Sequence, residues 1–163
     1  MIARSLVTLL IVTGIFLVGV PFLLLSAGLE LFPLHLGTIS LAGLGLISLG
    51  AVVLLWCGWI FGSMGRGTPA PFDPPKTLVR AGLYRKVRNP IYVGAEAVLF
   101  GEALFLGSST ILLYALALWA IFHLYLVYYE EPNLRRRFGE SYEEYCKAVP
   151  RWIPRVKRAG SLD

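Results

Sequence analysis

The chain has 163 residues, of which 56% are hydrophobic and only 15% charged, and its mean hydropathy is +0.68. Soluble domains carry about 25% charged residues, so this composition excludes an ordinary soluble domain and predicts an integral membrane protein. The length favours a single membrane-embedded domain over residues 1–163. The net charge of +5 alone would also suit a nucleic-acid partner.

Four apolar runs approach or exceed the ~20 residues that span a bilayer. They cover residues 6–29, 36–61, 91–106 and 110–128. The first run is too long for the apolar core of a signal peptide, so we expect a retained helix. The predicted fold class is therefore all-α: a polytopic membrane protein with four transmembrane helices and a cytoplasmic, amphipathic C-terminal helical tail.

The basic residues are placed asymmetrically. All 15 lysines and arginines fall at Arg4, in segment 66–88 or in segment 135–158, and the connections around 30–35 and 107–109 contain none. With four helices, the three basic places lie on one side of the membrane, which the positive-inside rule makes cytoplasmic. We therefore expect cytoplasmic N- and C-termini, contacts with anionic membrane lipids, and no nucleic-acid partner.

The two halves of the chain differ in chemistry. Residues 1–62 are expected to form two N-terminal packing helices, because their apolar runs contain no acid or base. In "GWIFG" (Gly58 to Gly62) the small residues stand four apart, a spacing that lets helix backbones approach. The chemically interesting groups follow in residues 63–163.

The third apolar run begins with "RNPIYVG", residues 88–94. Asn89 suits a helix cap, the proline after it suits a first turn, and Tyr92 suits an aromatic belt. This structural interpretation leaves Glu96 and Glu102 unexplained, because ionisable groups inside a membrane usually face a bundle interior or a wet cavity and mark function. Glu96 shares a face with Tyr92, whereas Glu102 lies deeper.

The fourth run places His123, Glu130 and Glu131 on one stripe that leads to its cytoplasmic end. A lone histidine in an apolar helix is often a satisfied core group, and a carboxylate pair is often a solvated helix end. Their alignment favours a functional role instead. One histidine with scattered glutamates lacks metal-ligand spacing, so we expect no metal site.

The polar tail is patterned as well, since apolar residues recur in it at helical spacing. They are Leu134, Phe138, Tyr142 and Tyr145. Such a tail is expected to fold back onto the rest of the chain. The features together predict a pocket on the cytoplasmic side that is open to lipid, for a small, partly cationic molecule and a lipid-soluble reactant.

The segments "RNPIYVG", "EEP" and "L…FGESYEEYCKAVPRWIP" together resemble the isoprenylcysteine carboxyl methyltransferase family, which is related to phospholipid N-methyltransferases. The match spans residues 67–154. The resemblance implies S-adenosylmethionine as cofactor and a lipophilic substrate that enters from the bilayer. It makes residues 63–163 the cofactor-binding catalytic half. The implied cofactor-binding residues are Arg88, Asn89, Pro90, Tyr92, Gly94, His123, Glu130, Glu131, Leu134, Phe138 and Tyr142.

The resemblance also suggests roles. Arg88 would pair with the cofactor carboxylate, Glu130 or Glu131 would bind its ribose hydroxyls or amino group, and the ring of Tyr92 would face the sulfonium. The catalytic candidates are Arg88, Glu102 and His123, of which the last two could orient or deprotonate the acceptor. Asn89 stands where the family usually has histidine, and an amide cannot titrate near neutral pH.

Two other functional classes stay open. One is a membrane reductase that uses NADPH, and the other is a non-enzymatic membrane module. The methyl acceptor is open too: a prenylated cysteine carboxylate, an amine headgroup, a thiol and a phenolic lipid each suit lateral, apolar entry.

Overall fold

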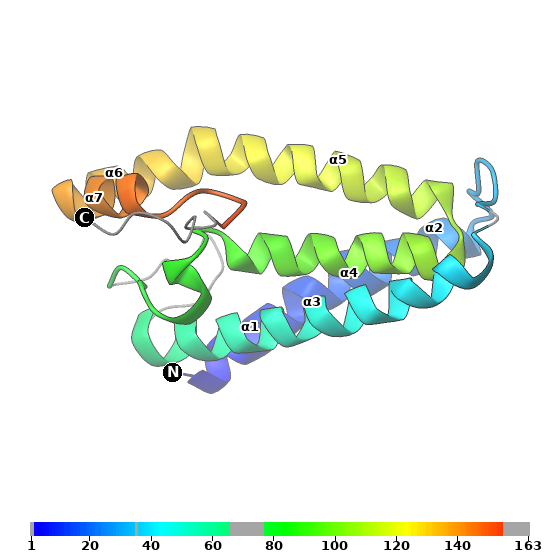
Figure 1. Ribbon diagram of the computed structural model, residues 1–163, viewed down its shortest axis with the longest axis horizontal. Coiled ribbons are helices and arrows are strands. Elements are labelled where there is room, and N and C mark those ends of the chain that lie inside the picture. The colour runs from blue at the N-terminus through cyan, green and yellow to red at the C-terminus, as the bar shows by residue number, and fades with distance from the viewer. Residues whose placement is uncertain (1, 35, 66–76, 155–163) are drawn as a thin grey trace, which may run out of the picture.

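The structure is a computed structural model and describes residues 2–34, 36–65 and 77–154 (Figure 1). These stretches are mostly helical and contain no strand, which confirms the helical class for the part described. The elements in chain order are α1 (Ile2–Gly14), η1 (Ile15–Gly19), α2 (Val20–Ser26), η2 (Gly37–Ile39), α3 (Ser40–Ile60), η3 (Phe61–Gly65), η4 (Gly82–Arg85), α4 (Pro90–Leu106), α5 (Ser109–Tyr125), η5 (Leu126–Glu130), α6 (Glu131–Phe138) and α7 (Glu140–Ala148).

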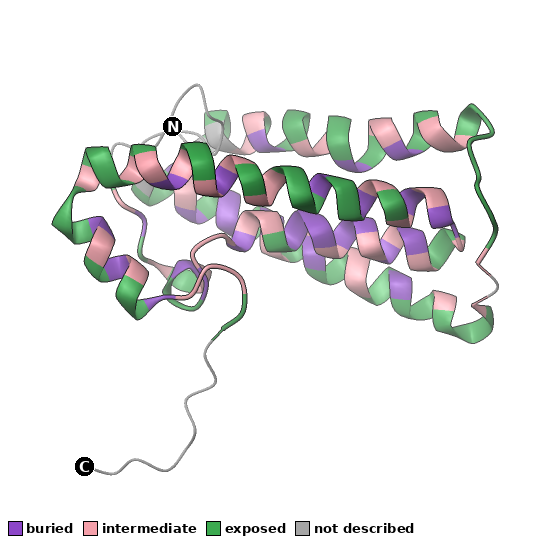
Figure 2. Cartoon of the chain, turned by 90° about the horizontal axis from the view of Figure 1, so that it is seen from above, coloured by how far each residue is buried: buried purple, intermediate pink, exposed green. Residues whose placement is uncertain are grey.

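Among the described residues, three continuous helices are long and apolar enough to cross a membrane. They are Leu6–Ser26, Gly37–Met64 and Ser109–Phe138, which correspond to three of the four predicted spans. The fourth, α4, has 17 residues, about 26 Å at the rise of an α-helix. Exposed residues follow the outward faces of the helices, and buried residues gather where the helices meet (Figure 2). These helices indicate a membrane protein.

The four long helical stretches are α1–η1–α2, α3, α4 and α5. They run in alternating directions (Figure 1). One end of the molecule contains the start of α1, the end of α3, the start of α4 and the α6–α7 pair. At the other end, Glu30 accepts hydrogen bonds from Ser108 Oγ at 2.5 Å, Ser109 Oγ at 2.8 Å and Ser109 N at 3.0 Å. These bonds favour the charged form and lower the pKa of Glu30. They tie the first inter-helix connection to the α4–α5 turn.

Helix α4 packs against α3 along a seam of four glycines. Gly43 faces Gly101, and Gly50 faces Gly94. A Cβ atom on Gly43 would lie 2.4 Å from the carbonyl oxygen of Gly101, and one on Gly50 would lie 2.6 Å from that of Gly94. The two backbones therefore touch, as small residues permit between membrane helices. This contact fixes α4, whose first turn carries the residues of the polar site.

Gly58 shows that the expected helix contact at "GWIFG" exists. A Cβ atom there would meet Leu9 Cδ2 at 2.6 Å, so α3 approaches α1 at this glycine. At the same end of α3, Cys57 and Ile60 form a buried cluster with Val79 and Tyr84. Part of the connection between the second and third runs thus belongs to the core.

Helices α6 and α7 fold back and bury one face. Tyr142, Tyr145 and Val149 form a cluster against Leu78, Leu134, Phe138 and Cys146. The turn between the helices is at Gly139, whose φ of 53° is a conformation that glycine adopts without steric cost. The hydroxyl of Tyr145 donates to the carbonyl of Tyr84 at 2.6 Å, which links the tail to the segment before α4.

Candidate functional site

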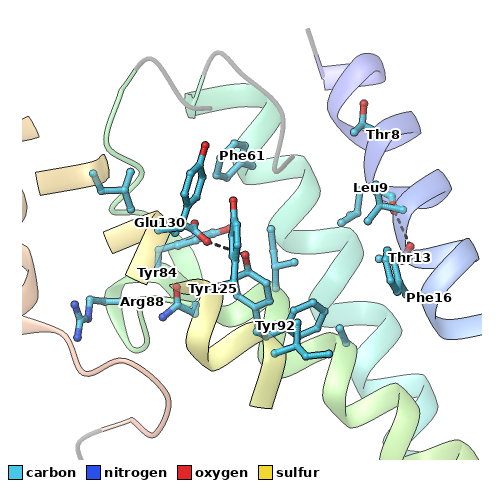
Figure 3. A pocket seen from close by; sticks show the side chains of 18 of the residues that line it. Thr8, Leu9, Thr13, Phe16, Phe61, Tyr84, Arg88, Tyr92, Tyr125 and Glu130 are labelled. Carbon is cyan, nitrogen blue, oxygen red and sulfur yellow. Dashed lines mark hydrogen bonds between the residues drawn. The ribbon is translucent and has the colours of Figure 1, made fainter. Parts of the chain in front are cut away.

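A cavity of about 680 Å³ lies between α1–η1, the start of α4 and the long α5–η5–α6 helix. Its volume is within the ~300–1,000 Å³ usual for small-molecule sites. Figure 3 shows Thr8, Leu9 and Phe16 on one side and Arg88 and Glu130 on the other. On the α1–η1 side the lining is mainly apolar, with Thr8 and Thr13 as its polar residues. The other polar residues of the lining are Tyr84, Arg88, Asn89, Tyr92, Tyr125, Tyr129, Glu130, Asn133 and Arg137. The cavity thus has an apolar flank on α1–η1 and a polar end.

Each of the three π-helical segments contributes to the lining. Phe16 and Leu17 come from η1, Phe61 from η3, and Tyr129 and Glu130 from η5. A π-turn inserts an extra residue into a helix and redirects the side chains that follow, which is why such turns often occur at functional sites. In this chain the π-turns aim side chains into the cavity.

Tyr92 and Glu130 are bonded neighbours in the cavity lining. The Tyr92 hydroxyl donates to Glu130 Oε2 at 2.7 Å. The ring of Tyr92 lies 4.9 Å from that of Phe122, centroid to centroid, and Phe122 also lines the cavity. A carboxylate and two aromatic rings therefore lie next to one another in the lining.

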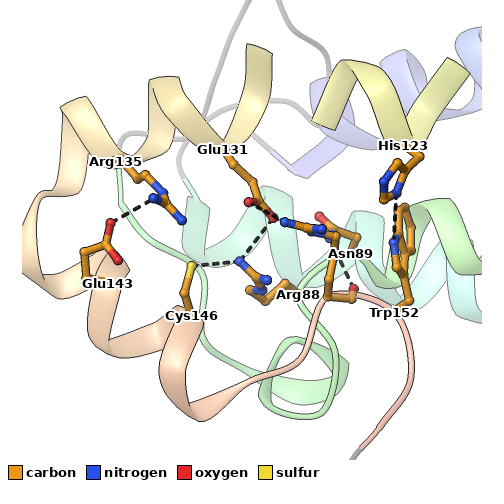
Figure 4. Close-up of polar contacts among 9 residues, drawn as sticks. Arg88, Asn89, His123, Glu131, Arg135, Glu143, Cys146 and Trp152 are labelled. Atoms are coloured by element: carbon orange, nitrogen blue, oxygen red, sulfur yellow. Dashed lines mark hydrogen bonds and ion pairs between the residues drawn. The ribbon is translucent and has the colours of Figure 1, made fainter. Parts of the chain in front are cut away.

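Glu131, next in sequence, has a different environment. It is 5% exposed and accepts two hydrogen bonds from Arg151, from Nε at 2.8 Å and from Nη2 at 2.9 Å. Arg88 Nη1 lies 3.1 Å from the same carboxylate, as Figure 4 shows. The hydrogen bonds from Arg151 to Glu131 also raise the pKa of Arg151. Glu131 does not line the cavity and instead holds Arg88 in place.

The segment 149–154 is hydrogen-bonded to the start of α4. The backbone N–H of Arg88 donates to the carbonyl of Pro150 at 2.9 Å, and Asn89 Nδ2 donates to the carbonyl of Arg151 at 3.2 Å. Asn89 occupies the cap position of α4 as expected, but its side chain makes no capping bond, because it binds this carbonyl. Trp152 Nε1 donates to His123 Nδ1 at 3.3 Å.

Several expected site residues lie away from the cavity lining. His123 packs against both Trp119 and Trp152, with ring centroids 5.6 and 6.0 Å away. Glu102 stands twelve residues after the start of α4, about 18 Å along the axis. Gly94 lies in the glycine seam. Pro90 is fully buried in the first turn of α4.

The three expected site residues of the tail also differ in whether they line the cavity. Leu134 lines the cavity, Phe138 packs in the tail cluster, and Tyr142 is buried at 3% exposure.

Neither carboxylate oxygen of Glu96 has a hydrogen-bond partner among the described residues. No group of three His, Cys, Asp or Glu side chains in these same stretches is placed to hold a metal ion.

Sequence reasoning missed four sets of residues at or beside the site. The α1–η1 flank was expected only to pack against other helices, and Asn133 and Arg137 were not among the expected site residues. Arg151 and Trp152 were visible only as part of the tail motif. Tyr84, four residues before Arg88, lines the cavity as well.

Comparison with known proteins gives consistent matches. The sequence profile of the phospholipid methyltransferase family matches residues 38–141, more than half of the chain. A protein-S-isoprenylcysteine O-methyltransferase of Schizosaccharomyces pombe is 41% identical over 80 residues, 48% of this chain and 34% of the relative. One of Xenopus laevis is 39% identical over 82 residues, 50% of this chain and 28% of the relative. The chain therefore spans about a third of the length of these relatives.

Proposed function

Because the chain belongs to the phospholipid methyltransferase family, we propose that it transfers a methyl group from S-adenosylmethionine to a lipid-soluble acceptor. The observation that carries the proposal is a cavity that combines a polar end with a mainly apolar flank. The polar end suits a charged cofactor, and the flank on α1–η1 suits an acceptor that arrives sideways from the bilayer. The matched relatives are named for isoprenylcysteine O-methylation, so a prenylated cysteine carboxylate is the acceptor to test first.

The residues at the polar end fit this cofactor. The buried Nε of Arg88 has no hydrogen-bond partner among the described residues, which leaves a donor for the carboxylate of the cofactor. Glu130 lines the same end and can accept from an ammonium or a ribose hydroxyl. The faces of Tyr92 and Phe122 can stabilise a sulfonium by cation–π attraction.

The cofactor supplies an electrophilic methyl group, and the chain supplies alignment and water exclusion. Tyr92 is held by its bond to Glu130, and Arg88 by its contact with Glu131. The segment 149–154 is bonded to the backbone of Arg88 and to the side chain of Asn89, which holds the start of α4 at the polar end. His123 and Glu102 lie outside the lining, which favours an acceptor that is already ionised at neutral pH, such as a carboxylate, and that needs no base from either.

The cofactor proposal can be tested by thermal unfolding of the protein purified in detergent. S-adenosylhomocysteine, the product of the donor, is expected to stabilise the fold by about 2.7 kcal/mol at one hundred times its Kd, because a ligand that binds only the folded state shifts the equilibrium. NADPH is expected to have no effect. Stabilisation by NADPH alone would favour a reductase, and no effect of either would favour a non-enzymatic module.

We also propose that all four long helices cross the membrane, α4 included, with both termini in the cytoplasm. The proposal is supported by the basic residues among those that the structure describes, which lie in segments at the end of the molecule where α1 and α4 begin. A cysteine at Glu140 is expected to react with an impermeant maleimide only from the cytoplasmic side, and one at Leu31 only from the opposite side. Both positions are exposed, so labelling of both from one side would contradict this topology.

A further inference from the structure

The long helix α5–η5–α6 presents two different sets of side chains to open space. Glu130 and Leu134 line both the main cavity and a second, smaller space of about 70 Å³. Another set, the rim stripe, lines the main cavity but not the smaller space. The rim stripe consists of Tyr125, Tyr129, Asn133 and Arg137. It therefore faces a part of the cavity away from the smaller space.

The rim stripe lies where the cavity opens. Its members stand four residues apart, a spacing that places side chains on one helix face. The rings of Tyr125 and Tyr129 lie 5.2 Å apart, centroid to centroid, so the π-turn η5 does not separate them. Tyr129, Asn133 and Arg137 are exposed although they line the cavity. Side chains that are both exposed and part of a lining mark the opening of a cavity.

Arg137 gives this opening a positive charge. Of the other charged residues in the lining, Arg88 contacts Glu131 and Glu130 accepts a hydrogen bond. Arg137, in contrast, has no ion-pair or hydrogen-bond partner among the described residues. A guanidinium with free donors recognises the oxygens of a carboxylate or a phosphate. Asn133, one turn earlier on the same face, adds an amide donor.

The opposite side of the cavity is the mainly apolar surface of α1–η1. Figure 3 shows Thr8, Leu9 and Phe16 across the cavity from Glu130. The cavity thus offers a cation and an amide on the rim stripe and apolar side chains on the facing helix. A molecule with an anionic group on an apolar chain complements both, because the guanidinium pairs with the anion and the facing helix removes the chain from water.

We propose that the rim stripe binds the anionic group of the acceptor, a carboxylate or a phosphate carried on an apolar chain, with Arg137 and Asn133 donating to its oxygens. The chain then lies along α1–η1. Tyr125 and Tyr129 flank the bound group, since tyrosine rings suit the boundary between headgroups and hydrocarbon. The inference rests on the proposed function and deepens it, because it assigns the charge of the acceptor and adds two specificity-determining residues.

The test compares two matched pairs of probes on the variant Arg137→Gln. One pair is N-acetyl-S-farnesylcysteine, a carboxylate, and its neutral methyl ester. The other is oleoylglycerol phosphate and neutral oleoylglycerol. Affinities are measured by isothermal titration calorimetry in a non-ionic detergent with S-adenosylhomocysteine at saturation. Partitioning of the probes into micelles cancels, because wild type and variant meet the same micelles.

Arg137→Gln is expected to weaken the binding of at least one anionic probe about fivefold, which is the contribution of a partly exposed ion pair. The neutral partner of that probe is expected to bind as it does to the wild type. The pair that responds identifies the bound group as a carboxylate or a phosphate. The affinity for S-adenosylhomocysteine is expected to stay unchanged, since the rim stripe is assigned to the acceptor.

The matched control is Arg136→Gln, which removes the same charge from the neighbouring position. Arg136 is exposed, as Arg137 is, but it does not line the cavity. This variant is expected to bind all four probes as the wild type does. Both variants are expected to keep the unfolding temperature of the wild type, because both side chains are exposed.

Equal losses for Arg137→Gln and Arg136→Gln would overturn the inference, because general surface charge would then attract the probes. It is also overturned if neither anionic probe responds to Arg137→Gln, if the neutral partners weaken as much, or if affinity for S-adenosylhomocysteine falls. Binding of S-adenosylhomocysteine to the wild type is a separate result that supports the proposed function whatever the four probes do. A wild-type protein that does not bind it would contradict the proposed function.

Discussion

Replacing Glu131 with glutamine is expected to destabilise the fold by about 3 kcal/mol, because removing one partner of a buried ion pair leaves uncompensated charge. Two guanidiniums, those of Arg88 and Arg151, would lose their carboxylate. The estimate is at the low end of the usual range, since the Arg151 side chain is 31% exposed. Affinity for S-adenosylhomocysteine is expected to fall tenfold or more as well, because Arg88 would no longer be held at the cavity.

The matched control for Glu131→Gln is Glu143→Gln. Glu143 pairs with Arg135 at 3.4 Å, and both side chains are about half exposed. Such surface pairs contribute about 0–1 kcal/mol, so this variant is expected to retain its unfolding temperature and its affinity. Unfolding in detergent and calorimetry measure both quantities. Equal effects of the two substitutions would show that Glu131 has no special part in holding the site.

Replacing Gly43 with alanine is expected to cost about 2–3 kcal/mol, the upper part of the range for overpacking a well-packed contact. The new Cβ atom would lie 2.4 Å from the carbonyl oxygen of Gly101 and 2.6 Å from the backbone nitrogen of Phe105. Backbone atoms cannot rotate away as a side chain can, so α3 and α4 would have to move apart. The first turn of α4 would move with the helix, and cofactor affinity is expected to fall too.

Gly45→Ala provides the control on the same helix. A Cβ atom at Gly45 meets nothing within 4 Å, and alanine is the better helix former by roughly 0.5–1 kcal/mol. This variant is expected to be as stable as the wild type or slightly more so. A comparable loss of stability for both variants, measured by unfolding in detergent, would mean that the α3–α4 contact is not the reason.

The family resemblance could be recognised from short motifs, and both kinds of comparison confirm it. The motif "RNPIYVG" keeps its residues within two turns at one helix start, so Arg88, Asn89 and Tyr92 reach the same cavity. Local spacing could not show that Gly94, in the same motif, turns towards α3. The direction of a side chain depends on which neighbour the helix packs against.

The stripe of His123, Glu130 and Glu131 was predicted from regular α-helical spacing. The π-turn Leu126–Glu130 interrupts that spacing, and the two adjacent carboxylates reach different partners. Glu130 binds Tyr92 in the cavity, whereas Glu131 binds Arg151 outside it. The capping role expected for the Asn89 side chain was wrong for a similar reason, since a distant carbonyl competes for its amide.

The amino-acid sequence by itself determined the helical class and the membrane character, because long apolar runs must satisfy their backbone groups internally and helices do so. It also determined which short segments carry charge at the polar end. Only the tertiary structure decided that α1–η1 supplies the mainly apolar wall of the cavity and that segment 149–154 is bonded to Arg88 and Asn89 at the start of α4. These contacts join residues far apart in the chain, and they depend on helix packing and π-turns that local patterns do not encode.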